Sequence, residues 1–209
     1  MKPLAIAFGV IVLLGVVLLA GGCNSYNRLN ESKQLVDKSW ADVQNVYQRR
    51  ADLIPNLVKT VEGAANFEKS TLAEVVQARQ QVTKIQIDPK SAPNDPEVLK
   101  RFQQTQDQLS STLSRLLVVS EKYPALTATA GFRDLQAQLE GTENRITVER
   151  GKFNDAVRTY NTSVTAMPAR LYAGAFGFQT RPYFAAREGS DVAPAVNFDF
   201  GKPAAAPAK

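Results

Sequence analysis

The sequence predicts an all-α protein: an antiparallel up-down four-helix bundle of long helices, preceded by an N-terminal membrane segment. Three observations point to this class. An uncharged, apolar run occupies residues 4–22. Prolines divide much of the remaining chain into long windows that contain no further proline. Within these windows apolar residues recur at alternating spacings of three and four, the period of an amphipathic helix, and no strand-like alternation of similar length competes.

The apolar run is followed at once by Cys23. About 18 or more consecutive apolar residues are enough to cross a bilayer. The tail LLAGGC also resembles a bacterial lipoprotein signal, in which Cys23 would be lipidated and become the new N-terminus, although Ala20 stands where leucine is usual. Two interpretations of residues 1–23 therefore stay open, an uncleaved transmembrane helix and a cleaved signal that leaves a lipid anchor. Both predict attachment to a bacterial cell membrane, and we expect the bundle to lie outside the cytoplasm.

The predicted bundle, residues 24–168, follows from the proline positions. The expected helices are the windows 4–54, 56–88, 97–123 and 125–167. Proline is tolerated in the first turn of a helix but interrupts its interior. Pro55 is therefore expected in the first turn of the second helix, with Asp52 as its N-cap. Arg49 and Arg50 would end the first helix, where cations complement the helix dipole.

The helical period also separates core from surface. It assigns Leu57, Leu113, Leu139 and Phe153, among others, to the core, and it leaves positions such as Gln48 and Gln138 exposed. Three polar residues fall on the same apolar faces: Lys33, Glu68 and Gln106. Glu68 has two interpretations, a carboxylate for a partner or metal, or a structural residue that fixes the register of the helices. The structural interpretation is favoured.

Composition excludes several classes of function. The chain has no histidine and one cysteine, which excludes Ser-His-Asp and Cys-His nucleophiles, histidine-ligated zinc, disulfide frameworks and Glu-x-x-His di-metal sites. The net charge of +5 comes from interspersed residues of both signs, without the basic clusters of nucleic-acid binders. We therefore expect no catalytic residue, cofactor, metal, small-molecule substrate or nucleic-acid partner.

The C-terminal extension, residues 169–209, begins with an aromatic segment. Between residues 170 and 184 stand five aromatic residues and two arginines: Tyr172, Phe176, Phe178, Tyr183, Phe184, Arg170 and Arg181. This composition suits a second contact with the membrane interface. The alternative is that the aromatic side chains fold back and cover the open end of the bundle. The last stretch, GKPAAAPAK, is predicted to be disordered.

Several motifs resemble the signature of the LemA family of bacterial membrane proteins. They are Tyr26-Asn27, WADVQNVYQRRADLIPNLV over residues 40–58, EKYPAL over 121–126, TENRI over 142–146 and FNDAVRTYN over 153–161. The resemblance covers residues 23 to about 184 and implies an N-terminally anchored antiparallel helical bundle without an established enzymatic activity. The candidate family residues, which we expect to be structural, are Trp40, Arg49, Arg50, Asp52, Pro55, Asn56, Glu68, Glu143, Asn144, Arg145, Asn154, Tyr160 and Asn161.

The leading functional hypothesis is a non-enzymatic, membrane-anchored bundle that scaffolds or regulates other envelope proteins. One alternative is a passive structural protein that only spaces parts of the envelope. The other is a cofactor binder that uses carboxylates inside the bundle. The sequence names no partner, and an inventory of crosslinked partners would separate these hypotheses best.

Overall fold

The computed structural model describes residues 2–64, 67–85, 87–88 and 90–186, with the backbone alone for 2–7, 10–11, 14–20 and 23. The predicted disordered tail, 201–209, lies outside these residues. The described helices are α1 (Lys2–Glu62), α2 (Lys69–Lys84), α3 (Pro96–Ser120), α4 (Pro124–Thr127), α5 (Ala130–Thr165) and α6 (Arg170–Ala173). No strand occurs among the described residues, so the all-α prediction is confirmed for them.

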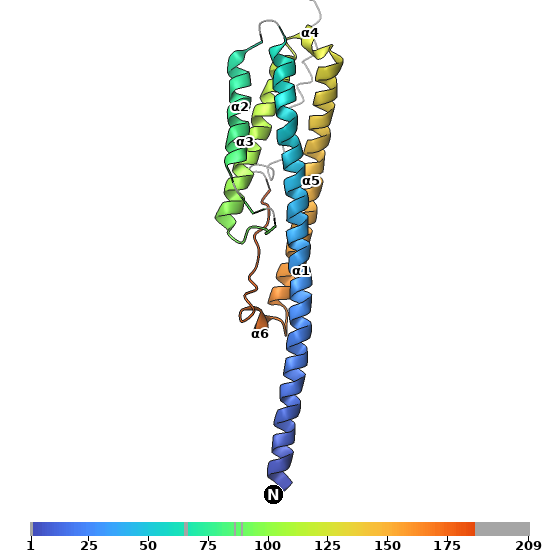
Figure 1. The fold of residues 1–209 in the computed structure, drawn as a ribbon, viewed down its shortest axis with the longest axis vertical. Helices are drawn as coiled ribbons and strands as arrows, with labels where there is room; N and C mark the ends of the chain where they lie inside the picture. The colour runs from blue at the N-terminus through green and yellow to red at the C-terminus, as the bar shows by residue number, and fades with distance from the viewer. Residues whose placement is uncertain (1, 65–66, 86, 89, 187–209) are drawn as a thin grey trace, which may run out of the picture.

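The helices form an elongated bundle (Figure 1). Helix α1 packs along α5, and α2 packs along α3 beside them. The N-terminal part of α1 extends alone beyond the other helices, and α6 lies against α1 near the point where α1 leaves the bundle. The bundle thus has one end next to the chain's N-terminal extension and an opposite end at α4.

The predicted helix boundary at Pro55 is wrong. Helix α1 continues through Pro55 to Glu62, so Asp52 does not cap a helix, and Arg49 and Arg50 do not end one. A proline inside a helix leaves the carbonyl four residues earlier without its amide donor. That carbonyl belongs to Ala51, and it accepts a hydrogen bond at 3.0 Å from Arg79 Nε of α2. A tertiary donor replaces the missing backbone donor, which is why the helix can continue.

The later helix starts agree better with local sequence signals. Asp95 caps α3 by accepting a 2.8 Å hydrogen bond from the Glu97 amide, and Pro96 occupies the first helical position. Thr129 accepts a longer one, 3.4 Å, from the Phe132 amide at the start of α5. Residues 87–88 and 90–95 belong to the connection between α2 and α3.

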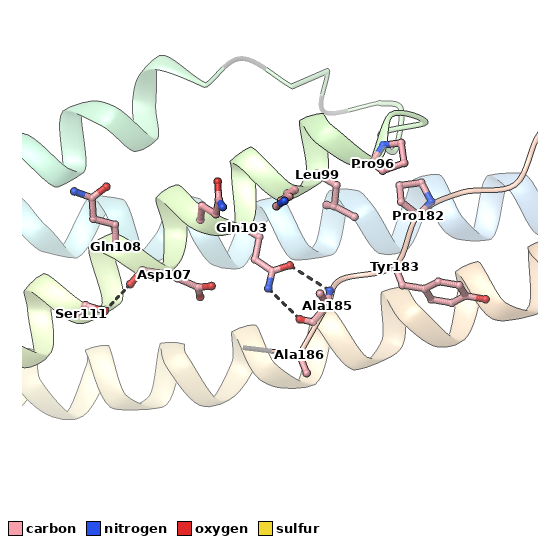
Figure 2. A pocket seen from close by; sticks show the side chains of 12 residues that line it. Pro96, Leu99, Gln103, Asp107, Gln108, Ser111, Pro182, Tyr183, Ala185 and Ala186 are labelled. Carbon is pink, nitrogen blue, oxygen red and sulfur yellow. Dashed lines mark hydrogen bonds between the residues drawn. The ribbon is translucent and has the colours of Figure 1, made fainter. Parts of the chain in front are cut away.

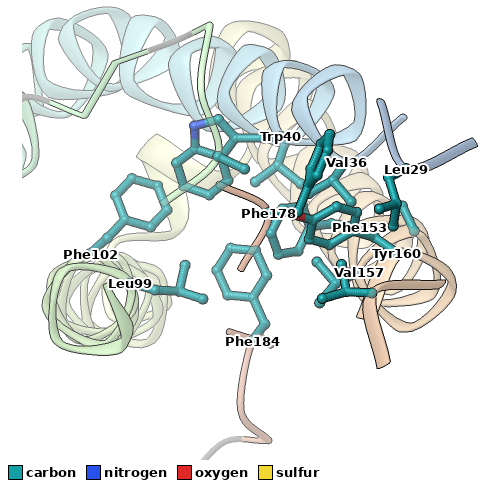
Figure 3. Close-up of a cluster of buried hydrophobic side chains, with 14 of the residues drawn as sticks. Leu29, Val36, Trp40, Leu99, Phe102, Phe153, Val157, Tyr160, Phe178 and Phe184 are labelled. Atoms are coloured by element: carbon teal, nitrogen blue, oxygen red, sulfur yellow. The ribbon is translucent and has the colours of Figure 1, made fainter. Parts of the chain in front are cut away.

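The core consists of two apolar clusters that follow each other along the bundle. In the cluster nearer to α6, the Trp40 ring lies against Phe102, Phe153 and Phe184, with ring centroids 5.3, 5.7 and 6.1 Å away (Figure 3). The cluster nearer to α4 is aliphatic for the most part and contains Leu57, Leu113 and Leu139. The four predicted core residues named above are buried, and both predicted surface glutamines are exposed.

Truncation of the predicted core residues tests this packing. Replacement of Leu57, Leu113, Leu139 or Phe153 by alanine should lower the free energy of unfolding by about 2–5 kcal/mol, because each leaves a cavity. Replacement of exposed Gln138 should change it by less than about 0.5 kcal/mol. Thermal denaturation followed by circular dichroism measures both. Equal losses from the two groups would contradict the packing.

No helix in the described part of the chain holds a stretch long and apolar enough to cross a membrane. Most side chains between Leu4 and Gly22, and that of Cys23, lie outside the described residues. The membrane segment and the lipidation site therefore stay predictions.

Candidate functional site

Among the described residues, the most deeply buried charge is Arg50, in the C-terminal part of α1. Its side chain is 1% exposed. It lies where the two apolar clusters meet. Tyr47, one turn before it on α1, belongs to the first cluster, and Ile54, one turn after it, belongs to the second. A cation buried at this level must be paired and hydrogen-bonded to be tolerated.

The partners of Arg50 come from two other helices. Its Nη1 donates to Ser110 Oγ at 2.7 Å and to Glu143 Oε1 at 2.5 Å. Its Nη2 donates to both the backbone and the side-chain oxygen of Gln106. The guanidinium also lies 5.1 Å from the centre of the Tyr47 ring. Gln106, Ser110 and Glu143 thus fix the register of α3 and α5 against α1.

The polar side chains around Arg50 also bond to one another. Glu143 is 41% exposed on its side chain, but its Oε1 is engaged by Arg50 and Ser110. Burial raises the pKa of the neighbouring Tyr47 phenol above its usual value, while Arg150 and Arg50 oppose the shift. The phenol therefore stays neutral around pH 7 and is no base at that pH. The Ser110 hydroxyl donates to Glu143 Oε1 at 3.4 Å, and the same oxygen accepts the shorter bond from Arg50.

A second polar site fixes the chain that follows α6. We call residues 178–186 the strap. Three amide side chains each bond both the N–H and the C=O of one strap residue: Asn161 with Arg181 at 2.8 and 2.9 Å, Asn154 with Phe184 at 2.9 and 3.1 Å, and Gln103 with Ala185 at 3.2 and 3.0 Å. Figure 2 shows the Gln103 pair. The amides supply the bonds that a neighbouring β-strand would otherwise provide.

Arg181 carries the strap's charge into the bundle. Its side chain is buried, donates to the Ala92 carbonyl, and lies 3.6 Å from Asp37 Oδ1. Asp37 also accepts from Lys33 at 2.9 Å and from the Ala92 amide at 3.1 Å. Burial raises the pKa of Tyr160, and contact with Arg181 partly offsets the shift. One ion network thus joins α1, the α2–α3 connection, α5 and the strap.

Removal of one of these amides should loosen the strap. Asn161→Ala leaves the N–H and C=O of Arg181 without their partners, so we expect the free energy of unfolding to fall by about 1–3 kcal/mol. Hydrogen exchange at the Arg181 amide should accelerate more than at the amides of α3. Asn144→Ala, at an exposed asparagine of the same helix, is the matched control. Equal exchange at Arg181 in both variants would contradict the role of Asn161.

The candidate residues fall into distinct places. Those in the two polar sites or the core are Trp40, Arg50, Glu143, Asn154, Tyr160 and Asn161. The exposed ones are Arg49, Asp52, Asn56, Glu68, Asn144 and Arg145, and Pro55 is half-buried within α1. Glu68, expected on an apolar face, is exposed and accepts from Thr71 at 3.1 Å. It precedes α2, so the apolar period of that helix does not reach it.

Sequence reasoning missed several residues of these sites. Gln103 and Asp37 are polar residues next to core positions, and nothing in their local pattern marks a distant backbone partner. Arg150 was also missed: it donates to the Ala185 carbonyl at 3.0 Å and lies 4.7 Å from the Phe184 ring centre. The sequence identifies Arg181 only as a cation of the aromatic segment, although its invariably charged side chain is buried.

The chain is similar in sequence to several known proteins. A family model described as the LemA family matches residues 39–198. Over 82 residues, 39% of this chain, the sequence is 30% identical to Magnetosome protein MamQ 2 of Paramagnetospirillum magneticum and covers 30% of that protein. It is 23% identical to Protein LemA of Metamycoplasma hominis over 146 residues, which are 70% of this chain and 59% of the relative. The chain therefore spans less than two thirds of each of these relatives.

Proposed function

The chain belongs to the LemA family, and from this premise we propose that it is a non-enzymatic, membrane-anchored four-helix bundle of the bacterial cell envelope. Its role in this proposal is to scaffold or regulate other envelope or membrane proteins. The bundle stands outside the cytoplasm, held by residues 1–23 as a transmembrane helix or through a lipid on Cys23.

The continuity of α1 carries the proposal. One 61-residue helix joins the apolar N-terminal run to the core of the bundle without a flexible linker. The N-terminal part of α1 extends alone (Figure 1). Phe8 and Leu13, in the first turns of that helix, are exposed. Bulky apolar side chains on an isolated helix are costly in water and stable in lipid. A rigid helix of this kind would hold the bundle at a fixed height above the membrane.

The buried charges of the two polar sites bond within the bundle. Arg50 and Arg181, the buried charges, are engaged by internal partners. Among the described residues no three His, Cys, Asp or Glu side chains group in a way that could hold a metal ion. A carboxylate-based cofactor binder therefore has less support than a scaffold.

The end of the bundle at α4, which we call the distal end, offers a surface for a partner. A groove of about 850 Å³ lies there beside α2, lined in part by Phe67, Leu72 and Val76. A partner that docks in it would be held far from the anchor, as a scaffold requires. A passive spacer has no use for such a surface, so the two alternatives predict different crosslinking.

Position-specific crosslinking in the native membrane tests the scaffold. A photo-reactive residue at Val76 in the distal groove, or at exposed Val118 near the end of α3, should give a discrete adduct. The same probe at exposed Arg158 of α5 should not. No adduct at any exposed position of the bundle would contradict the scaffold and leave the passive spacer.

Intact mass of the membrane-extracted protein tests the anchor. A lipoprotein should have lost residues 1–22 and gained acyl groups, and Cys23→Ser should block this processing. A transmembrane helix should retain Met1 and its unmodified mass. Recovery of the full chain from the aqueous fraction would contradict both forms of the anchor.

A further inference from the structure

Helix α6 and the turn after it lie against a short stretch of α1. The Tyr172 ring is so close to Gly22 that a Cβ added there would lie 3.9 Å from Tyr172 Cε1. One turn further along α1, the Tyr26 ring meets the Phe176 ring edge-on, with centroids 5.2 Å apart. The segment around α6 is therefore level with residues 22–26, directly after the apolar run.

The turn after α6 separates an inner from an outer surface. Gly177 adopts a positive φ of 75°, and the Phe178 amide donates to the Ala173 carbonyl at 2.9 Å, so the chain reverses there. Ala173 and Phe178 face inward and are buried in the first core cluster. The strap from Phe178 onward is therefore bound to the bundle.

The outer surface of the same segment is apolar and uncovered. Met167 is 68% exposed, Leu171 66% and Phe176 46%. Arg170 is exposed among them. Exposed apolar residues that gather at one site mark a contact with lipid or protein. Apolar side chains together with aromatic rings and arginine are the composition found at the membrane–water interface.

This surface lies level with the end of the apolar run of α1, and that position indicates the bilayer as its partner. A helix rises about 1.5 Å per residue, so the run from Leu4 to Gly22 spans about 28 Å, close to the thickness of a hydrocarbon core of about 30 Å. Gly22 would then lie at the edge of the hydrocarbon, and Tyr172 beside it at the level of the headgroups. If Cys23 is lipidated instead, its acyl chains bring the same stretch of α1 to the same surface.

We propose that residues 167–176 form a second lipid contact, in which Met167, Leu171 and Phe176 enter the interfacial layer of the bilayer that holds the anchor. This inference rests on the anchor in the proposed function. It divides the aromatic segment of the sequence in two: the strap packs on the bundle, and the part before it meets the membrane. Two contacts at one end of a long bundle oppose its tilting.

Fluorescence quenching by brominated lipids tests this contact in the full chain. Trp40 is the single tryptophan and is buried in the core. Bromine atoms in the lipid should therefore not quench it, and its emission gives a constant background. Phe176→Trp and Leu171→Trp report on the proposed contact, Leu13→Trp on the anchor, and Val118→Trp on the distal surface. Each variant is synthesised unprocessed into nanodiscs of brominated phosphatidylcholine. The bromine is close to the headgroup for positions 171, 176 and 118, and near the end of the acyl chains for position 13, which would lie about 14 Å deeper than Gly22.

The expected result is that the added fluorescence at positions 176 and 171 is lost on bromination, while that at position 118 and of Trp40 is retained. Quenching at position 13 without quenching at 176 and 171 would overturn the second contact and leave the anchor intact. No quenching at all three would overturn the anchor and the contact together. Quenching at 176 and 171 alone would support the contact and contradict the anchor.

Discussion

Replacement of Glu143 by alanine is expected to lower the free energy of unfolding by about 1.5–3 kcal/mol, because it removes a charge-assisted hydrogen bond from a buried cation. Arg50 cannot lose its proton to escape this cost, since a guanidinium stays charged in proteins. The Arg50 side chain is 1% exposed whereas that of Glu143 is 41% exposed, so water that enters the vacated site compensates for part of the lost interaction. Chemical denaturation followed by circular dichroism gives the free energy directly.

The control for this prediction is Glu140→Ala, one turn away on α5. Glu140 is exposed, and its Oε1 accepts from Gln136 at 3.0 Å. This variant should differ from the native chain by less than about 0.5 kcal/mol. Losses of equal size in the two variants would show that Glu143 contributes only as a surface residue.

A double variant separates the energy of the pair from the cost of breaking it. Arg50→Met with Glu143→Leu replaces both charges by apolar groups of similar reach, and such replacements are often neutral or stabilising. We expect the double variant to be more stable than Glu143→Ala. If it is less stable, the pair contributes net stability through its bonds to Gln106 and Ser110.

The sequence predicted the apolar core because burial depends on local periodicity. Leu57, Leu113 and Leu139 lie on apolar faces at helical spacing, and a helix with such a face must cover it whatever its neighbours are. Pro55 misled the prediction because its effect on a helix depends on a distant residue. The carbonyl that Pro55 leaves free is bonded by Arg79, and no pattern around Pro55 announces that donor.

The polar sites were harder to predict for the same reason. Arg50 stands next to Arg49 in the sequence, yet one is buried and the other exposed. Only the rotation of α1 against α3 and α5 decides which arginine meets Glu143. The sequence left two interpretations of the aromatic segment open, because the bonds that hold the strap run from side-chain amides to backbone atoms. Asn154 and Asn161 are seven residues apart on one face of α5, but their partners have no side-chain signature.

Replacement of Phe184 by alanine is expected to destabilise the protein by about 3–5 kcal/mol, the usual cost of removing a buried phenylalanine. Phe184 is 4% exposed although it lies outside every helix. Its ring centre lies 5.3 Å from that of Phe153 and 6.1 Å from that of Trp40 (Figure 3). The guanidinium carbon of Arg150 lies 4.7 Å from the same ring centre. Without it, a cavity opens in the first cluster.

Tyr183→Ala is the matched control, because this neighbouring side chain is 47% exposed and its loss should change stability by less than about 0.5 kcal/mol. The Trp40 emission reports on the same event, and only Phe184→Ala should shift it to longer wavelength as water reaches the indole.

A chain that ends at Pro168 should lose at least as much stability as Phe184→Ala, because it lacks the amide bonds of the strap as well as the ring. If the truncated chain melts at the native temperature, the strap is an attachment to a finished bundle. If it melts lower, the strap is part of the core.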